Sequence, residues 1–141
     1  MNVPRFLLDT NILSEATKPQ PNSVMMGKLE QYTQAIATAS VVLHELMFGC
    51  YRLPSSKRRQ KLEEYIASLL VKSTPVFSYD FNAAQWHALE RARLVSLGRT
   101  PPYIDGQIAA IAVVNDLILI TNNMADYADF QNLQLENWFE L

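Results

Sequence analysis

Short apolar runs alternate with longer segments of helical periodicity along the chain, and this alternation constrains the fold more than any other feature. The first run, Phe6–Leu8, ends abruptly at Asp9, which is typical of a strand buried on both faces. Further strands are predicted at residues 35–40, 75–79, 117–120 and 133–135. Helices are predicted at residues 24–33, 41–51, 57–71, 82–97 and 103–115.

Strands that alternate with helices predict an α/β sandwich around a mainly parallel sheet of four or five strands. The length of 141 residues fits one domain, residues 1–141. Ligands of such sheets bind beyond the carboxyl ends of the strands. Asp9 follows one predicted strand and Thr121 follows another, so we expect both residues at one rim of the sheet, where the sequence predicts a site.

Composition bounds the cellular setting of the chain. Apolar residues make up 49% and charged residues 18%, which is enough to build a packed core. Cys50 is the single cysteine, so no intramolecular disulfide is possible and a reducing compartment is favoured. The apolar run before Asp9 is too short for a signal-peptide core or a membrane span. We therefore expect a cytoplasmic protein that does not associate with membranes.

Charge is distributed unevenly although the net charge is only −2. All 12 Lys and Arg residues lie at or before Arg99 together with 8 of the 14 acids, so this part carries +4. Residues 100–141 hold 6 acids and no Lys or Arg. This acidic third is either a solvated surface or a place where cations are held.

Two carboxylates fall on helix faces that should turn toward the core. Glu45 has Val41 and Val42 on its side of a predicted helix, and Asp105 heads the apolar stripe of another. Burying such groups unpaired is costly, and close neighbours raise each other's pKa. Arg5 is the only nearby base in sequence, so a divalent cation is the better partner. Carboxylates without a His or Cys cluster favour Mg²⁺ or Mn²⁺, and their chemistry at a strand rim is phosphodiester hydrolysis.

Some of these residues could instead have purely structural roles. Asp9 with Thr10 and Asn11 could be only the N-cap of a helix after a strand. Asp105 could be a first-turn acid that complements the helix dipole. Glu45 has no comparable structural role, because it lies inside a helix among valines.

These residues carry a resemblance to PIN-domain proteins, and among them to toxins of the VapC type, over nearly the full chain. The matching segments are FLLDTNILSE (6–15), SVVLHELMFG (40–49), PPYIDGQIAAIA (101–112), ITNNMADY (120–127) and LENW (135–138). The resemblance implies a three-layer α/β/α sandwich and an Mg²⁺- or Mn²⁺-dependent endoribonuclease. It also implies a homodimer that a small VapB-type antitoxin inhibits.

The resemblance also assigns roles to single residues. Asp9 and Asp105 match the main metal ligands, and Glu45 matches a third acid that binds the ion or orients water. Thr121 matches the family's Ser or Thr that positions water or ligand during catalysis. The fourth acid matches either Asn123 or Asp126, and we choose Asp126 because an amide carries no charge. Asn11 is expected to form hydrogen bonds within the site and is a candidate to bind the substrate.

Other chemistries fit the sequence less well. His44-Glu45 lacks the second histidine of the HExxH zinc motif, because position 48 is Phe. A phosphatase of the haloacid dehalogenase type needs Asp where Asn11 stands. Two rival functions stay open. One is a catalytically weak PIN-like module that acts through antitoxin binding and autoregulation, and the other is a DNA-directed PIN nuclease.

RNA binding requires cations outside the acidic cluster. Lys57, Arg58, Arg59 and Lys61 open one helix, although such a run is often only a solvated face. Arg91 and Arg93 precede Asp105 and are candidates to flank the scissile strand. Tyr103 either stacks on a base or packs in the core.

Overall fold

Five short strands form one sheet in the order β3-β2-β1-β4-β5 in the computed structural model, which describes residues 3–140. Every neighbouring pair is parallel. The strands are β1 (Phe6–Leu8), β2 (Ile36–Ala39), β3 (Val76–Phe77), β4 (Ile118–Ile120) and β5 (Leu135–Glu136). The central strand β1 pairs with both β2 and β4, so that Leu7 lies opposite Ala37 on one side and Leu119 on the other.

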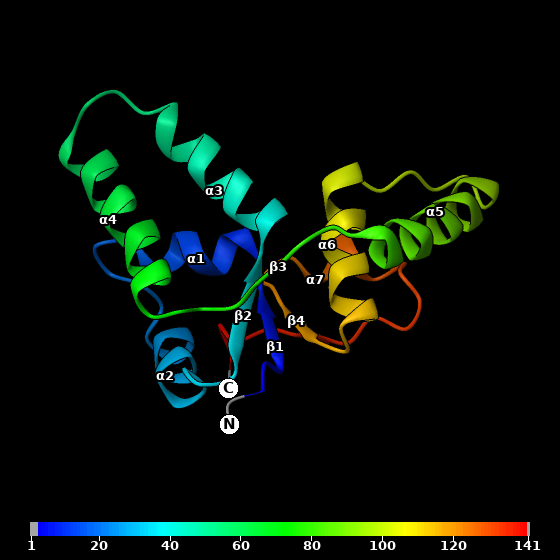
Figure 1. Cartoon of the computed structure of the whole chain (residues 1–141), viewed down its shortest axis with the longest axis horizontal. Helices are drawn as coiled ribbons and strands as arrows, with labels where there is room; N and C mark the ends of the chain where they lie inside the picture. The colour runs from blue at the N-terminus through cyan, green and yellow to red at the C-terminus, as the bar shows by residue number, and fades with distance from the viewer. Residues whose placement is uncertain (1–2, 141) are drawn as a thin grey trace.

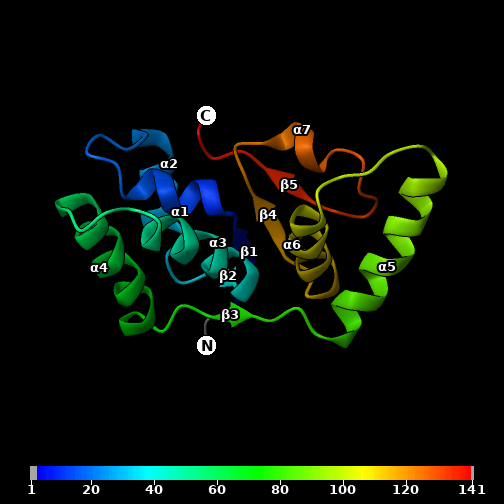
Figure 2. The same cartoon turned by 90° about the horizontal axis from the view of Figure 1, so that it is seen from above.

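Helices connect these strands and cover both faces of the sheet. They are α1 (Thr10–Ala16), α2 (Ser23–Gln31), α3 (Ser40–Tyr51), α4 (Lys57–Val71), α5 (Phe81–Ser96), α6 (Tyr103–Val114) and α7 (Met124–Tyr127). Helices α1–α4 lie on one side of the sheet and α5 and α6 lie on the other (Figures 1 and 2). The predicted three-layer α/β/α sandwich with a parallel five-stranded sheet is confirmed.

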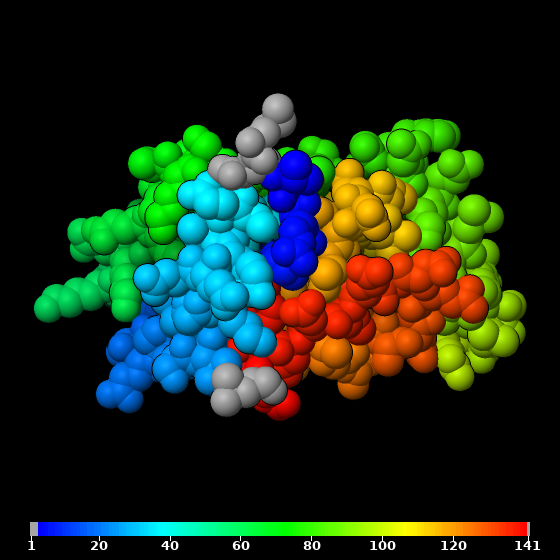
Figure 3. Space-filling model, turned by 90° about the horizontal axis from the view of Figure 1, so that it is seen from below, coloured from blue at the N-terminus to red at the C-terminus, as the bar shows by residue number. Residues whose placement is uncertain are grey.

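The core is densest around the central strands. Phe6, Leu7 and Leu8 are all buried, as expected for a strand covered on both faces. Seen from below, the blue N-terminal segment lies between the cyan segment that contains β2 and the yellow-orange segment that contains β4 (Figure 3). Trp138, which is fully buried, packs against Phe6 and Tyr32 with ring centroids 5.1 and 5.5 Å apart, and so fixes the C-terminal segment to the sheet.

The predicted elements agree with the observed ones in type, with two differences. Helices α1 and α7 are absent from the predicted ranges, although the N-cap reading of Asp9 allows for α1. They span only seven and four residues and are too short for a helical hydrophobic period to stand out. The fifth strand begins at Leu135 instead of residue 133.

Over residues 3–140, the structure contains no helix with the length and apolar character needed to cross a membrane.

Candidate active site

The carboxyl ends of β1 and β4 bring Asp9 and Thr121 together, as the sheet topology predicts. Asp9 is 5% exposed and serves as the N-cap of α1, where its Oδ1 accepts a hydrogen bond of 2.8 Å from the backbone N–H of Thr10. Its Oδ2 accepts three more, from Asn11 Nδ2 (3.1 Å), Thr121 Oγ1 (2.9 Å) and the Tyr127 hydroxyl (3.2 Å). Four donors from three segments therefore fix the orientation of this carboxylate.

A polar network behind Asp9 joins the two strand ends. Asn11 donates to Thr121 Oγ1 at 3.3 Å and accepts from the backbone N–H of Asn122 at 3.1 Å. Thr121 Oγ1 also accepts from the backbone N–H of Asn123 at 3.0 Å. Thr121 is fully buried and does not line the pocket in front of Asp9, so its hydroxyl acts on the site through Asp9. The expectation that Asn11 forms hydrogen bonds within the site agrees with these contacts.

The four predicted acids line one cavity of about 580 Å³. Asp9 follows β1, Glu45 projects from α3, Asp105 from the first turn of α6, and Asp126 from α7. Glu45 and Asp105 are half-buried, and Asp126 is exposed at the rim. Asn123 lines the same cavity, so both candidates for the fourth position lie at the site.

Burial and like charges act together on Asp105. Its pKa is raised to about 6, first by burial and then by the charges of Asp9, Asp126 and Glu45. The charge of Asp126 therefore lies within electrostatic reach of Asp105, whereas Asn123 lines the cavity as an uncharged amide. The choice of Asp126 as the fourth acid stays a prediction.

No ion pair in residues 3–140 involves any of these four acids. Of the bases in that part of the chain, only Lys18 lines the pocket, and it pairs with Glu15 at 2.8 Å. That contact and the backbone N–H of Asn22 lower the pKa of Glu15 against the effect of its burial. Glu15 is thus a fifth carboxylate at the rim, and it is already neutralised.

The carboxylates that line the cavity are too far apart for three of them to bind one metal ion directly. Among the described residues, no three His, Cys, Asp or Glu side chains lie close enough together to hold one ion as they stand. The donors of the cavity are carboxylate, hydroxyl and amide oxygens, the set preferred by hard cations. A dication there requires either small side-chain adjustments or bridging waters.

Of the four residues predicted to bind substrate, Asn11 lines the pocket, whereas Arg91, Arg93 and Tyr103 do not. For Arg93 the prediction is corrected. Its guanidinium makes two hydrogen bonds, of 2.7 and 2.9 Å, to the buried carboxylate of Glu90 and a third to the carbonyl of Asp129. Arg91 instead lies over the ring of Tyr103, 5.2 Å from its centroid, and both side chains are exposed.

Tyr127 is the site residue that sequence reasoning missed. It is 2% exposed, and burial together with the charges of Asp9 and Asp105 raises the pKa of its phenol, so the hydroxyl keeps its proton and donates to Asp9. The sequence shows only that a tyrosine directly follows Asp126. A tyrosine that becomes buried needs a hydrogen-bond partner for its hydroxyl, and this is the one signal that could have pointed to Tyr127.

The family model of the PIN domain matches residues 6–129, and the chain belongs to that family. The tRNA(fMet)-specific endonuclease VapC of Shigella flexneri is 33% identical over 95% of this chain and 98% of its own. Ribonuclease VapC2 of Rickettsia felis is 28% identical over 94% of this chain and 97% of its own. These relatives place the chain in the VapC group of the family.

A solved structure of a VapC-type complex has the same fold. The crystal structure of VapBC2 from Rickettsia felis, bound to a DNA fragment from its promoter, superimposes with a TM-score of 0.82. Identity over that match is 27%, and the match covers 96% of this chain and 98% of the other.

Proposed function

We propose that this chain is an endoribonuclease toxin that hydrolyses RNA phosphodiester bonds with Mg²⁺ or Mn²⁺ and is neutralised by a VapB-type antitoxin. The observation that carries the proposal is a cavity lined by Asp9, Glu45, Asp105 and Asp126, none of which forms an ion pair with a base in residues 3–140. The names of the VapC relatives, which are ribonucleases and a tRNA endonuclease, support the reaction. An RNA substrate and the unpaired Cys50 fit a cytoplasmic location.

The pocket fits a hard dication by charge and by donor type. Mg²⁺ commonly takes only one or two protein carboxylates and keeps several waters, so an open arrangement of acids suits it better than a closed cage. A bound ion supplies positive charge opposite the phosphate oxygens and lowers the pKa of water. Repulsion among the four acids falls when it binds, which favours the ionised form of Asp105.

The protein groups divide the remaining work by their positions. Asp9 and Asp105, which both line the cavity, would hold the ion. Oδ2 of Asp9 accepts three hydrogen bonds, whereas Oδ1 accepts only one, so Oδ1 is the oxygen with capacity to bind a ligand. Glu45 and Asp126 would add negative charge or accept a proton from water.

The exposed pair of Arg91 and Tyr103 is the RNA contact that we propose outside the cavity. Tyr103 opens α6 two residues before Asp105, and the guanidinium of Arg91 covers its ring. An exposed ring beside a cation suits an unpaired base and its phosphate. Single-stranded RNA at the rim of the cavity is the substrate form that this pair favours.

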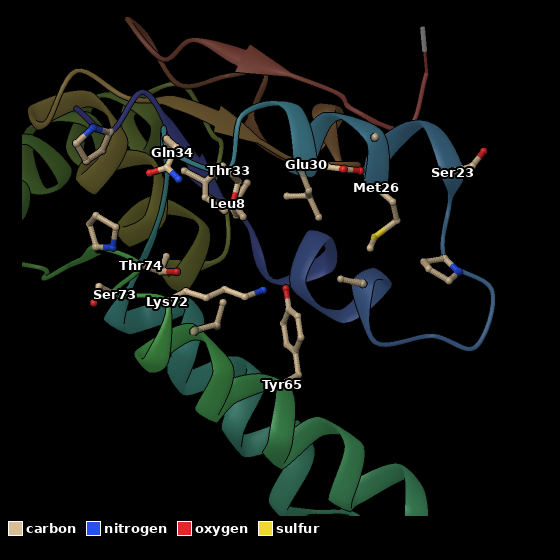
Figure 4. A pocket seen from close by; sticks show the side chains of 18 residues that line it. Leu8, Ser23, Met26, Glu30, Thr33, Gln34, Tyr65, Lys72, Ser73 and Thr74 are labelled. Carbon is tan, nitrogen blue, oxygen red and sulfur yellow. The ribbon is translucent and has the colours of Figure 1, made fainter. Parts of the chain in front are cut away.

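A second cavity supports the antitoxin as partner. An apolar groove of about 1120 Å³ lies between α2 and α4, and we name it the α2–α4 groove after the helices whose residues line it. Figure 4 shows Met26 and Glu30 of α2 facing Tyr65 of α4 and Lys72, which directly follows that helix. An amphipathic antitoxin segment with an apolar stripe and charged edges matches this lining. The VapBC2 structure of Rickettsia felis supports such a partner.

Substitution in the groove tests the antitoxin contact separately from cleavage. Met26→Glu places a charge in the α2–α4 groove, whereas Gln31→Glu adds the same charge on the same helix outside it. Co-purification with a VapB-type antitoxin should be lost only for Met26→Glu, with RNA cleavage unchanged for both. The homodimer expected from the resemblance is tested in the same preparations by sedimentation equilibrium.

The function itself is tested by incubating the purified chain with labelled single-stranded RNA, with Mg²⁺, with EDTA, and with EDTA followed by excess Mg²⁺. We expect internal cuts that EDTA abolishes and Mg²⁺ restores. RNA binding without cut ends would support the weak-module alternative. Cleavage of matched DNA but not of RNA would support the DNA nuclease.

A further inference from the structure

The first turn of α6, which carries Asp105, approaches α5 more closely than any side chain at position 106 would allow. A Cβ atom built on Gly106 would meet three ring atoms of His87, the nearest being Nε2 at 2.2 Å. Glycine is therefore required at this contact, although its φ is unexceptional. Gly106 and His87 are both buried, so the contact is a permanent part of the packing.

His87 is itself held from the other side. Its Nδ1 lies 2.8 Å from the hydroxyl of Tyr79, and its ring centroid lies 4.9 Å from that of Tyr103. Burial raises the pKa of Tyr79 to about 12, and the neighbouring Tyr103 adds to this rise. The imidazole is thus clamped between the segment before α5 and the start of α6.

The first turn of α6 lacks a side-chain cap. Pro102 at the N-cap of α6 offers no side-chain hydrogen bond, whereas Asp9 and Asp80 cap α1 and α5. The position of the turn therefore depends on packing, to which the close contact between Gly106 and His87 contributes.

We propose that His87 is a positioning residue, and that its contact with Gly106 holds the first turn of α6 where Asp105 can serve the acidic cavity. The imidazole touches neither the cavity nor Asp105, and it acts through the backbone of Gly106. The proposal rests on the proposed function for its purpose, but the geometry can be tested in the absence of both RNA and metal.

The test compares the wild type with Gly106→Ala, His87→Ala, the double variant and a matched control. Gly49→Ala is the control, because Gly49 lies in helix α3 four residues after Glu45 and a Cβ there meets nothing within 4 Å. The readouts are the distance between the Cα atoms of Asp9 and Asp105 in crystal structures of the metal-free chain, the Kd for Mn²⁺ without RNA, and the Tm.

Gly106→Ala should displace Asp105 relative to Asp9 and weaken Mn²⁺ binding about tenfold, as changes behind a metal ligand commonly do. His87→Ala should also move both values, and the double variant should recover toward the wild type, because the new methyl occupies space that the ring leaves. Gly49→Ala should change neither value. If Gly106→Ala does not fold, the comparison of His87→Ala with the double variant decides the question.

An unchanged position of Asp105 in folded Gly106→Ala, or no recovery in the double variant, would overturn the proposal. A change in Tm alone, with the distance from Asp9 to Asp105 and Mn²⁺ binding unchanged, would show that His87 serves only stability and would also overturn it. A chain that fails to cut RNA yet shows the expected pattern of distances would refute the proposed function and leave the positioning role standing.

Discussion

The hydroxyl of Tyr127 lies 3.2 Å from Oδ2 of Asp9 and donates a hydrogen bond to it from the end of α7. Both side chains are buried, so this contact joins two segments 118 positions apart at the base of the acidic cavity. It is also the contact least visible in the sequence.

Tyr127→Phe removes this donor and leaves the ring in place. We expect a loss of stability of about 1 kcal/mol and a fall in cleavage rate of roughly tenfold, because Asp9 loses one of its four donors. Urea unfolding and initial cleavage rates measure the two effects. Tyr51→Phe is the control, since Tyr51 is exposed at the end of α3. Equal activity of both variants would contradict a role for the hydroxyl.

Thr121→Val and Thr121→Ser separate the hydroxyl of Thr121 from its shape. The hydroxyl donates to Asp9 and accepts from Asn11 and Asn123, so valine leaves buried polar groups without their partner. We expect Thr121→Val to cost about 2 to 3 kcal/mol in unfolding free energy, whereas Thr121→Ser keeps the network and loses little more than a methyl. A valine variant as stable as the serine variant would be inconsistent with the network.

Asp105→Asn should stabilise the metal-free chain at neutral pH. The pKa of Asp105 in the folded chain is about 6, above its ordinary value, so the folded chain retains this proton at a pH where the unfolded chain has lost it. Stability from this group is thus largest below pH 4 and falls as the pH rises to about 6. After allowance for solvent screening of a half-buried carboxyl, we expect a gain of about 1 kcal/mol at pH 7.

Thermal unfolding of the wild type and Asp105→Asn in EDTA at pH 4, 5, 6 and 7 measures this difference. The difference in Tm between Asp105→Asn and the wild type should be smallest at pH 4 and increase up to about pH 6. Added Mg²⁺ should raise the Tm of the wild type and so reduce this difference. A gap that does not depend on pH would refute the crowding of charge in the cavity.

Arg91→Gln and Arg93→Gln should fail in different ways. Arg91 is exposed and stacks on Tyr103, so its loss should weaken RNA binding several-fold, estimated from a lost stacking and phosphate contact, and leave Tm unchanged. Loss of Arg93 leaves the buried carboxylate of Glu90 without its ion pair and should lower Tm more than loss of the exposed Arg99. Filter binding and thermal melts distinguish them, and the reverse pattern would contradict both assignments.

Much of this architecture is predictable because short apolar strands and amphipathic helices carry strong periodic signals. The run Phe6–Leu8 followed by Asp9 predicts both a buried strand and the location of the rim, and the observed topology brings Thr121 beside it. Glu45 and Asp105 are detectable because a carboxylate on an apolar helix face conflicts with local burial.

The remainder depends on contacts that no local pattern encodes. The bond from Tyr127 to Asp9 and the fit of Gly106 against His87 form only when segments far apart in the chain meet. Arg93 was predicted to contact RNA because it lies shortly before Asp105 in the sequence. That position does not reveal its ion pair with Glu90, which lies three residues earlier in the same helix. Side-chain direction in a helix decides such pairs, and it depends on how the helix packs.

Replacement of Asp9 with asparagine tests the central claim most directly, because the account requires the charge of this residue and not its shape. Asp116→Asn is the matched control, since Asp116 lies outside the cavity at a φ of 55° that asparagine adopts readily. Endonucleolytic cleavage of RNA in Mg²⁺ should be lost in folded Asp9→Asn and retained in Asp116→Asn. Full Mg²⁺-dependent cleavage by purified Asp9→Asn would contradict the account.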